Sequence, residues 1–165
     1  MYHPSSSKKP SKYQTKEQIT DAVIRLLANR DHSKHELINK LQSRCEHLES
    51  LEQVIAECEE KGYQSDTRFA QMIIRTRIEQ WYGLERVEQE LDAKGIEAEV
   101  SQLALEEAEC DWYSVASECF IRKYQRSYNA DDPKSYAKTV RAMAGRGFTM
   151  EQVFHAIPGA NETEI

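Results

Sequence analysis

Apolar residues recur along this chain at the three- and four-residue spacing that is typical of amphipathic helices. The first such stretch covers residues 15–30, where Thr15 can cap a helix whose apolar stripe runs from Ile19 through Val23 to Leu27. Long runs of β-branched residues are absent, and the chain has only 6 glycines and 4 prolines. The pattern therefore predicts an all-α protein.

Two further helices are predicted before residue 64. Ser33 followed by Glu36 forms a capping-box pattern at the start of a short helix with apolar residues to Leu41. The next stripe lies within residues 49–61, and Gly62 follows it at the place where a helix C-cap is expected. These helices make a first unit of three.

The same sequence of caps, stripes and breaks begins again after a shift of 50 residues. Matching pairs are Thr15 with Ser65, Ile19 with Phe69, Val23 with Ile73, Ser33 with Gly83, Leu37 with Val87, Leu41 with Leu91 and Arg44 with Lys94. The last helix of this second copy is predicted at residues 97–108, with Val100, Leu103 and Ala104 on its apolar face. Cys45 stands where the second copy has Gly95.

A third copy follows at a slightly longer shift. Asp111 is expected to cap a long helix through Ser127, Pro133 to begin a short one that Gly147 stops, and Thr149 to cap the last. The predicted organisation is three tandem three-helix repeats at 15–64, 65–110 and 111–158, between a flexible polar tail at 1–14 and a C-terminal tail at 159–165. Stacked units of this kind predict an elongated curved rod.

Composition narrows the class of protein. The hydrophobic fraction of 39% and the charged fraction of 30% suit a thin body of small stacked units. No stretch approaches the roughly 20 apolar residues of a membrane span, and the N-terminus lacks the apolar segment of a signal peptide. We therefore expect a cytoplasmic protein without a membrane partner.

The sequence carries no pattern of residues that points to catalysis. It lacks a phosphate-binding loop, a G-x-S-x-G elbow, an H-E-x-x-H metal motif and a dinucleotide fingerprint. The 4 cysteines are scattered without a C-x-x-C pair, as for buried cysteines in a reducing compartment. We expect no enzyme activity, no metal and no cofactor.

Charge is distributed unevenly in a chain whose net charge is −6. Residues 65–110 hold 11 acidic and 5 basic side chains, whereas residues 122–146 hold seven basic side chains against only Asp131 and Asp132. This basic segment is the candidate binding surface, since phosphates and acidic surfaces attract such clusters. Its members are Arg122, Lys123, Arg126, Lys134, Lys138, Arg141 and Arg146. Tyrosines interleave with them, either to pack between repeats or to stack on bases.

Short motifs follow one another in order within residues 20–155. They are His32-Ser33-Lys34-His35-Glu36-Leu37 with Lys40-Leu41, then Gly62-Tyr63 with Asp66-Thr67-Arg68-Phe69-Ala70, then Tyr82-Gly83-Leu84-Glu85-Arg86-Val87 with Glu90-Leu91 and Lys94-Gly95-Ile96, and finally Asp111-Trp112 and Arg146-Gly147-Phe148. Taken together in this order, they resemble the motifs of the RecX family. The motif residues are Glu36, Leu37, Leu41, Gly62, Tyr63, Arg68, Phe69, Tyr82, Gly83, Arg86, Leu91, Lys94, Gly95, Gly147 and Phe148.

The resemblance implies three tandem three-helix repeats and a monomeric, non-enzymatic regulator. It implies binding to filaments of the RecA recombinase, and usually inhibition of their ATP hydrolysis, strand exchange and coprotease activity, in DNA repair, recombination and the SOS response. A nucleic-acid-binding helical module that acts through residues 122–146 is the alternative. Single- or double-stranded DNA therefore stays open as a direct partner.

Overall fold

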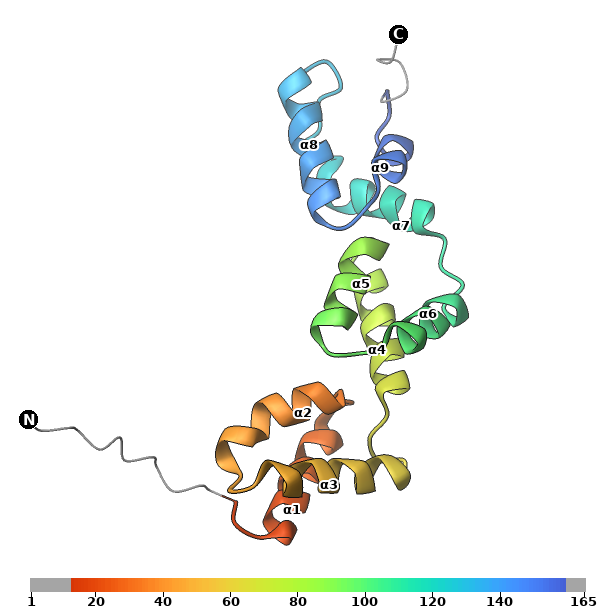
Figure 1. The fold of residues 1–165 in the computed structure, drawn as a ribbon. Helices are drawn as coiled ribbons and strands as arrows, with labels where there is room; N and C mark the ends of the chain where they lie inside the picture. Colours follow the sequence, from red (N-terminus) through yellow and green to blue (C-terminus); the bar gives the residue numbers. More distant parts are fainter. Residues whose placement is uncertain (1–12, 160–165) are drawn as a thin grey trace, which may run out of the picture. The chain divides into compact units, whose positions relative to one another are not determined.

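The computed structural model describes residues 13–159, and within them the chain forms nine α-helices (Figure 1). The prediction of an all-α protein is confirmed, since the described residues contain one isolated β-bridge and no strand. The helices are α1 (Lys16–Asn29), α2 (Lys34–Leu41), α3 (Leu48–Glu60), α4 (Asp66–Glu79), α5 (Leu84–Ala93), α6 (Ala98–Glu107), α7 (Trp112–Cys119), α8 (Pro133–Gly145) and α9 (Met150–Ala156).

The helices divide into two compact units, Met1–Asp66 and Thr67–Ile165. The first unit holds one hydrophobic cluster, built by α1 to α3. The second unit holds two clusters, one in the second predicted repeat and one in the third, and Ile78 and Trp112 pack against both. The predicted rod concerns the arrangement of the two units and stays a prediction.

Local capping explains where the helices of the first unit begin. The Thr15 hydroxyl accepts from the Gln18 backbone N–H, and the Gln18 side chain returns to the Thr15 N–H, which completes a capping box. The Ser33 hydroxyl accepts from the Glu36 N–H at the start of α2. The predicted apolar residues of α3, Leu51, Val54, Ile55 and Cys58, are all buried.

One residue of the predicted tail contacts the first unit. Tyr13 falls in the predicted polar tail, but its N–H donates to the Arg44 carbonyl, its own carbonyl accepts from the Glu46 N–H, and its ring packs on the first cluster. The rest of that tail, residues 1–12, and residues 160–165 lie outside the described residues. Cys45 has φ −94°, so α2 ends in a 3-10 turn (η1, Gln42–Arg44) instead of the left-handed turn that Gly95 makes at +71°.

In the second repeat, α4 and α5 supply most of the buried residues. Phe69, Ala70, Ile73 and Ile74 come from α4, and Val87 and Leu91 from α5. The structure corrects one residue of α6, because Leu103 is predicted on its apolar face but is 55% exposed. Only Ala104 of α6 is fully buried, so this helix is the least embedded of the three.

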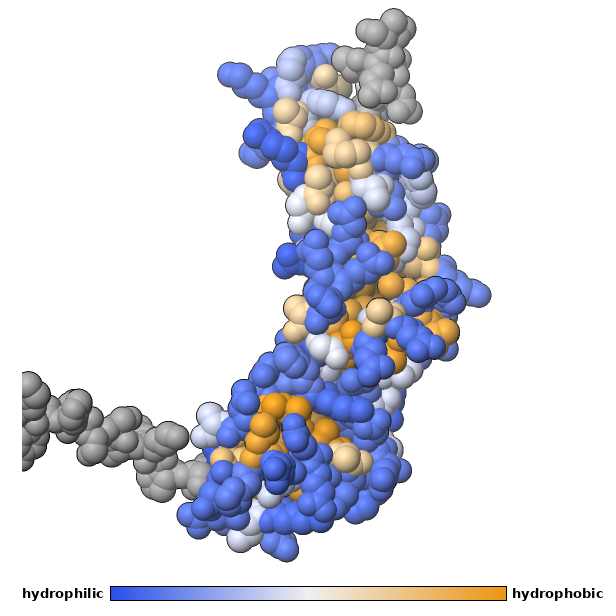
Figure 2. All heavy atoms as spheres, viewed as in Figure 1, coloured by the Kyte–Doolittle hydropathy of each residue, from blue (hydrophilic) through white to orange (hydrophobic). Residues whose placement is uncertain are grey.

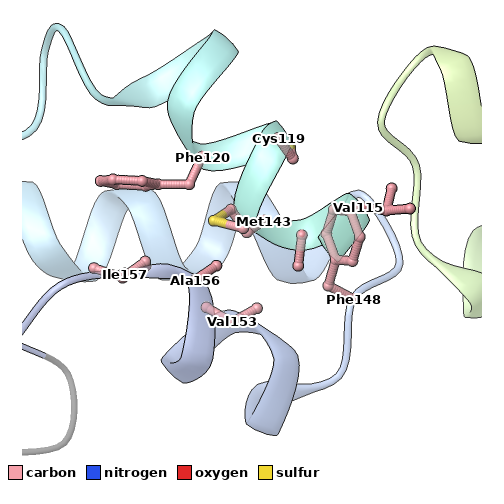
Figure 3. Close-up of a cluster of buried hydrophobic side chains, with 9 residues drawn as sticks. Val115, Cys119, Phe120, Met143, Phe148, Val153, Ala156 and Ile157 are labelled. Atoms are coloured by element: carbon pink, nitrogen blue, oxygen red, sulfur yellow. The ribbon is translucent and has the colours of Figure 1, made fainter. Parts of the chain in front are cut away.

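The third repeat buries Phe120, Met143 and Phe148 between α7, α8 and α9 (Figure 3). Asp111 caps α7 as predicted, but the α-helix ends at Cys119 and continues as a π-helical turn, η2 (Phe120–Tyr124), in which the Gln125 N–H donates to the Phe120 carbonyl. The helix predicted as short, α8, has 13 residues, because Asp132 and Pro133 begin it and no breaker follows before Gly145.

Candidate functional site

The predicted basic segment occupies η2, the loop after it and α8. Arg122 and Lys123 lie on η2, Arg126 in the loop, and Lys134, Lys138 and Arg141 on α8; these six are exposed. Arg146, the C-cap of α8, is half-buried. The segment therefore covers one exposed surface and, at Arg146, the contact between the second and third repeats. We call this contact, formed by Trp81 to Gly83 with Arg146 and Gly147, the joint.

Arg146 belongs to the joint, and its role in the binding surface stays a prediction. Its Nε donates to the Trp81 carbonyl at 2.9 Å and its Nη2 to the Gln80 carbonyl at 2.6 Å, so the guanidinium caps the end of α4. It also lies over the Tyr82 ring, with Cζ 4.1 Å from the centroid. An arginine with these partners stabilises the fold, since two of its five N–H donors already bind backbone carbonyls.

Two glycines bring the backbone of the second and third repeats together at this joint. The Gly83 N–H donates to the Arg146 carbonyl at 2.8 Å, and the Glu85 N–H to the Gly147 carbonyl at 3.2 Å. A Cβ on Gly83 would lie 2.2 Å from the Gly147 carbonyl oxygen, and one on Gly147 would lie 2.4 Å from the Arg86 nitrogen. Both motif glycines are required because any side chain would separate the two backbones.

Trp81 lies at the joint with a strained backbone conformation, and its ring contacts Lys123. Its φ of +58° lies in the left-handed region, which costs a non-glycine residue roughly 1–2 kcal/mol. The hydrogen bond from Arg146 to its carbonyl offsets part of that cost. The Lys123 ammonium lies 5.3 Å from the centroid of the Trp81 ring, so Lys123 also contacts the joint.

The cations in the middle of the basic segment differ from Arg146 in having few partners within the fold. Arg126, Lys134 and Lys138 form no ion pair with a carboxylate among residues 13–159. Arg122 pairs with Glu118 at 3.3 Å, but both side chains are more than half exposed, so the pair is weak. The Arg141 Nε donates to the Ala137 carbonyl at 3.3 Å.

Lys134 and Lys138 line a groove of about 310 Å³ between η2 and α8. The groove also contains the side chains of Tyr124, Ser135 and Thr139. Burial raises the pKa of the Tyr124 phenol, which therefore stays protonated at neutral pH and able to donate. The Thr139 hydroxyl already donates to the Ser135 carbonyl at 3.0 Å, so the two ammonium groups and the hydroxyls of Tyr124 and Ser135 are the donors that can bind a phosphate or a carboxylate. We name this surface, together with the exposed Arg126 that precedes the lining residue Ser127 in the sequence, the basic groove.

The hydroxyls of the basic groove were missed by sequence reasoning, although a signal existed. Ser135 and Thr139 repeat the four-residue spacing of Lys134 and Lys138, one position further along α8. Asp132 lines the same groove and caps α8 through the Lys134 N–H, so a carboxylate lies at one end. That end is less favourable for an anion.

Most of the RecX-like motif residues hold the repeats together. Leu37, Leu41, Phe69, Leu91 and Phe148 are core residues, Gly62 and Gly95 lie in left-handed turns at helix ends, and the Lys94 backbone caps α5. The Glu36 carboxylate accepts from the Arg30 guanidinium at 2.9 and 3.2 Å. Tyr63, Arg68 and Arg86 are the members of the set whose side chains are exposed.

Two other kinds of feature are absent from the described residues. Among them, no three His, Cys, Asp or Glu side chains gather in a way that could hold a metal ion. No helix in residues 13–159 combines the length and apolar character that crossing a membrane requires.

Comparison with protein families finds two matches. Residues 65–105 match the second three-helix domain of RecX, and residues 111–157 match the third. The regulatory protein RecX of Chromohalobacter salexigens is 37% identical over 142 residues, which are 86% of this chain and 92% of that protein. The RecX of Haemophilus influenzae is 31% identical over 143 residues, 86% of this chain and 93% of its own.

Solved structures agree with the fold. The crystal structure of RecX from Lactobacillus salivarius has a TM-score of 0.73 at 18% identity, covering 89% of this chain and 97% of that one. A second crystal structure, of regulatory protein RecX, has a TM-score of 0.72 at 17% identity, covering 83% and 70%.

Proposed function

The chain belongs to the RecX family of regulatory proteins, and we propose that it binds RecA filaments and restrains their ATP hydrolysis, strand exchange and coprotease activity. The basic groove is the proposed contact. The observation that supports it is the set of three exposed cations, Arg126, Lys134 and Lys138, without an ion-pair partner among the described residues.

A recombinase filament forms on DNA, so its groove offers both phosphates and protein carboxylates. Cations without intramolecular partners lose little on meeting such groups, because no existing ion pair has to be broken. Arg146 and Lys123 are less suitable, since Arg146 already donates to two carbonyls and Lys123 lies over Trp81.

Regulation requires that the protein distinguishes two states of the filament. A bound protein shifts an equilibrium only by the difference between its affinities for the two states. We propose that the regulator binds the inhibited state more tightly. A shift from 1:99 to 99:1 would need a difference of about 5.5 kcal/mol, shared over many bound copies.

The first prediction reverses the three charges of the basic groove. The variant R126E/K134E/K138E should bind DNA-bound RecA filaments at least about tenfold more weakly, with a smaller dependence on salt, because each lost phosphate contact removes roughly one unit of the log–log slope. Filament binding would be measured by anisotropy across a salt series, and inhibition by the filament's ATPase rate.

A matched control separates the site from net charge. R25E/K40E/R44E changes the charge by the same amount on exposed residues of the first unit that have no ion-pair partner among the described residues. It should bind nearly as the unchanged protein does. Equal loss in both variants, or no loss in either, would remove the basic groove from the proposed contact.

Direct DNA binding is the second candidate, and one observation favours it. Tyr124 and the hydroxyls beside Lys134 and Lys138 resemble the mixture of rings, donors and cations found where single strands bind. Titrating DNA alone, without RecA, separates the candidates. A nucleic-acid module would bind DNA with the salt slope seen on filaments, whereas a filament regulator would bind DNA alone much more weakly.

A further inference from the structure

A second groove lies in the second repeat, away from the basic segment. It measures about 560 Å³, the size of a small ligand site, and runs between α5 and α6. Leu84, Glu88 and Asp92 line it from α5 at four-residue intervals. A stripe of eight residues on a helix covers about 12 Å, so the groove is roughly as long as two helical turns.

Apolar groups form the inner part of this groove. Ile96 is 5% exposed, while Leu84, Leu105 and Trp112 are partly exposed within the groove. The face in Figure 2 shows apolar side chains among charged ones over the part of the chain that α4 to α6 form. Leu105 and Trp112 also pack on the cluster beneath, so this apolar surface is anchored in a folded core.

The rim of the groove is acidic. Glu88, Asp92 and Glu106 line it, and none of them pairs with a cation among residues 13–159. The Glu106 carboxylate accepts from the side-chain amide of Gln102, one turn earlier on α6. The sequence from 84 to 112 contains ten carboxylates and two cations, Arg86 and Lys94, neither of which lines the groove.

We propose that this acidic groove docks a basic amphipathic helix of a protein partner. An occupant of two turns would place apolar side chains at i, i+3 or i+4 and i+7 against Leu84, Leu105 and Trp112, and lysines or arginines beside the rim carboxylates. The apolar contacts supply affinity, and the charges select the partner and its orientation.

A second copy of this chain fits the groove less well. Its most basic helix, α8, exposes Lys134, Lys138 and Arg141, but the other exposed residues of that face are small. The large apolar residue Met143 is fully buried in the third cluster. The α8 helix of a second copy therefore has the positive charges but lacks exposed large apolar side chains. We infer that the acidic groove binds a helix of another protein.

The groove contains its own reporter. Trp112 and Trp81 are the two tryptophans of the chain, so W81F leaves Trp112 as the single emitter. The probe is a synthetic helix of about 14 residues, with leucines at i, i+3, i+4 and i+7 and lysines elsewhere. On W81F, the peptide should shift the Trp112 emission to the blue with saturable binding.

Two changes test the two halves of the proposal. E88K/D92K should weaken the peptide by about tenfold or more, because two attractive rim charges become repulsive. A peptide with the leucines replaced by serines should lose saturable binding. The matched control, E49K/E52K on exposed residues of α3, changes the net charge equally and should bind as W81F does.

Several outcomes would overturn the proposal. Equal weakening by E49K/E52K, or equal binding of the serine peptide, would mean attraction by net charge alone. A concentration-dependent shift of Trp112 without peptide, removed by R126E/K134E/K138E, would assign the groove to a second copy. Because the basic groove takes no part in the docking, R126E/K134E/K138E should keep its affinity for the peptide even if the proposed filament contact fails.

Discussion

The two ends of the basic segment lie in different environments. At the C-terminal end, the Arg146 guanidinium donates to two carbonyls and lies over an aromatic ring. Twelve residues earlier, Lys134 extends beside an open groove without an ion-pair partner in the described part of the chain. Neighbouring positive charges in a sequence can therefore serve folding or binding, depending on how many acceptors the fold places around each.

This difference separates two measurable quantities. Residues of the joint, Gly83, Arg146 and Gly147, should change the free energy of unfolding when they are substituted. Residues of the basic groove should change binding and leave the free energy of unfolding almost unaltered. A variant that changed both stability and binding, or a joint variant that changed only binding, would contradict this division between the joint and the basic groove.

The largest loss of stability is expected at the glycine contact. G83A places a Cβ 2.2 Å from the Gly147 carbonyl oxygen, and G147A places one 2.4 Å from the Arg86 nitrogen at a φ of +95°. Both obstacles are backbone atoms, so the two repeats must move apart and lose their hydrogen bonds. We expect a loss of about 3 kcal/mol or more in urea denaturation of either variant.

Two other glycines provide controls. A Cβ on Gly145, which ends α8, would meet no heavy atom within 4 Å, so G145A should be neutral or stabilise by up to about 1 kcal/mol. Gly62 has equal space but a φ of +76°, so G62A should lose about 1 kcal/mol from backbone strain alone. If G83A cost no more than G62A, the close approach would not be what holds the joint.

The helices and their caps could be predicted from the sequence because their causes are local. Thr15, Ser33, Asp111 and Thr149 act on backbone groups two or three residues away, and apolar stripes follow the period of the helix. The end of α2 was not predicted, because Cys45 turns through a 3-10 segment and pairs with Tyr13, more than 30 residues away.

The joint could not be predicted either, because it depends on residues that are far apart in the sequence. Gly83 and Gly147 meet across 64 residues, and a contact at that distance leaves no period in the sequence. Charge density found the basic segment but could not show that Arg146 lies over Tyr82. Leu103 matched the apolar stripe of α6 but is exposed, whereas Ala104 is fully buried and Val100 and Leu105 pack partly buried on the second cluster, because that helix lies between two open grooves.

An intermediate effect is expected at Arg146. R146A removes two charged hydrogen bonds to the carbonyls that end α4 and the contact with Tyr82, so the free energy of unfolding should fall by about 2–3 kcal/mol. R146K keeps the charge, but a single ammonium lacks the planar fork that reaches both carbonyls, so most of the loss should remain. Recovery in R146K would show that charge alone matters and that Arg146 belongs with the lysines.

The smallest change in stability is expected in the basic groove. In K134A/K138A, two exposed ammonium groups without ion-pair partners among residues 13–159 disappear from α8, and alanine favours the helix slightly more than lysine does. The free energy of unfolding should therefore stay within about 0.5 kcal/mol of its original value. Filament affinity should nevertheless fall, and its salt slope should decrease by about two, since two phosphate contacts are lost. Urea denaturation would measure the stability of this variant, and a salt series on the same preparation would measure its filament affinity. A loss of stability as large as that of R146A would place these lysines in the folding of the third repeat, and the two ends of the basic segment would then serve one purpose.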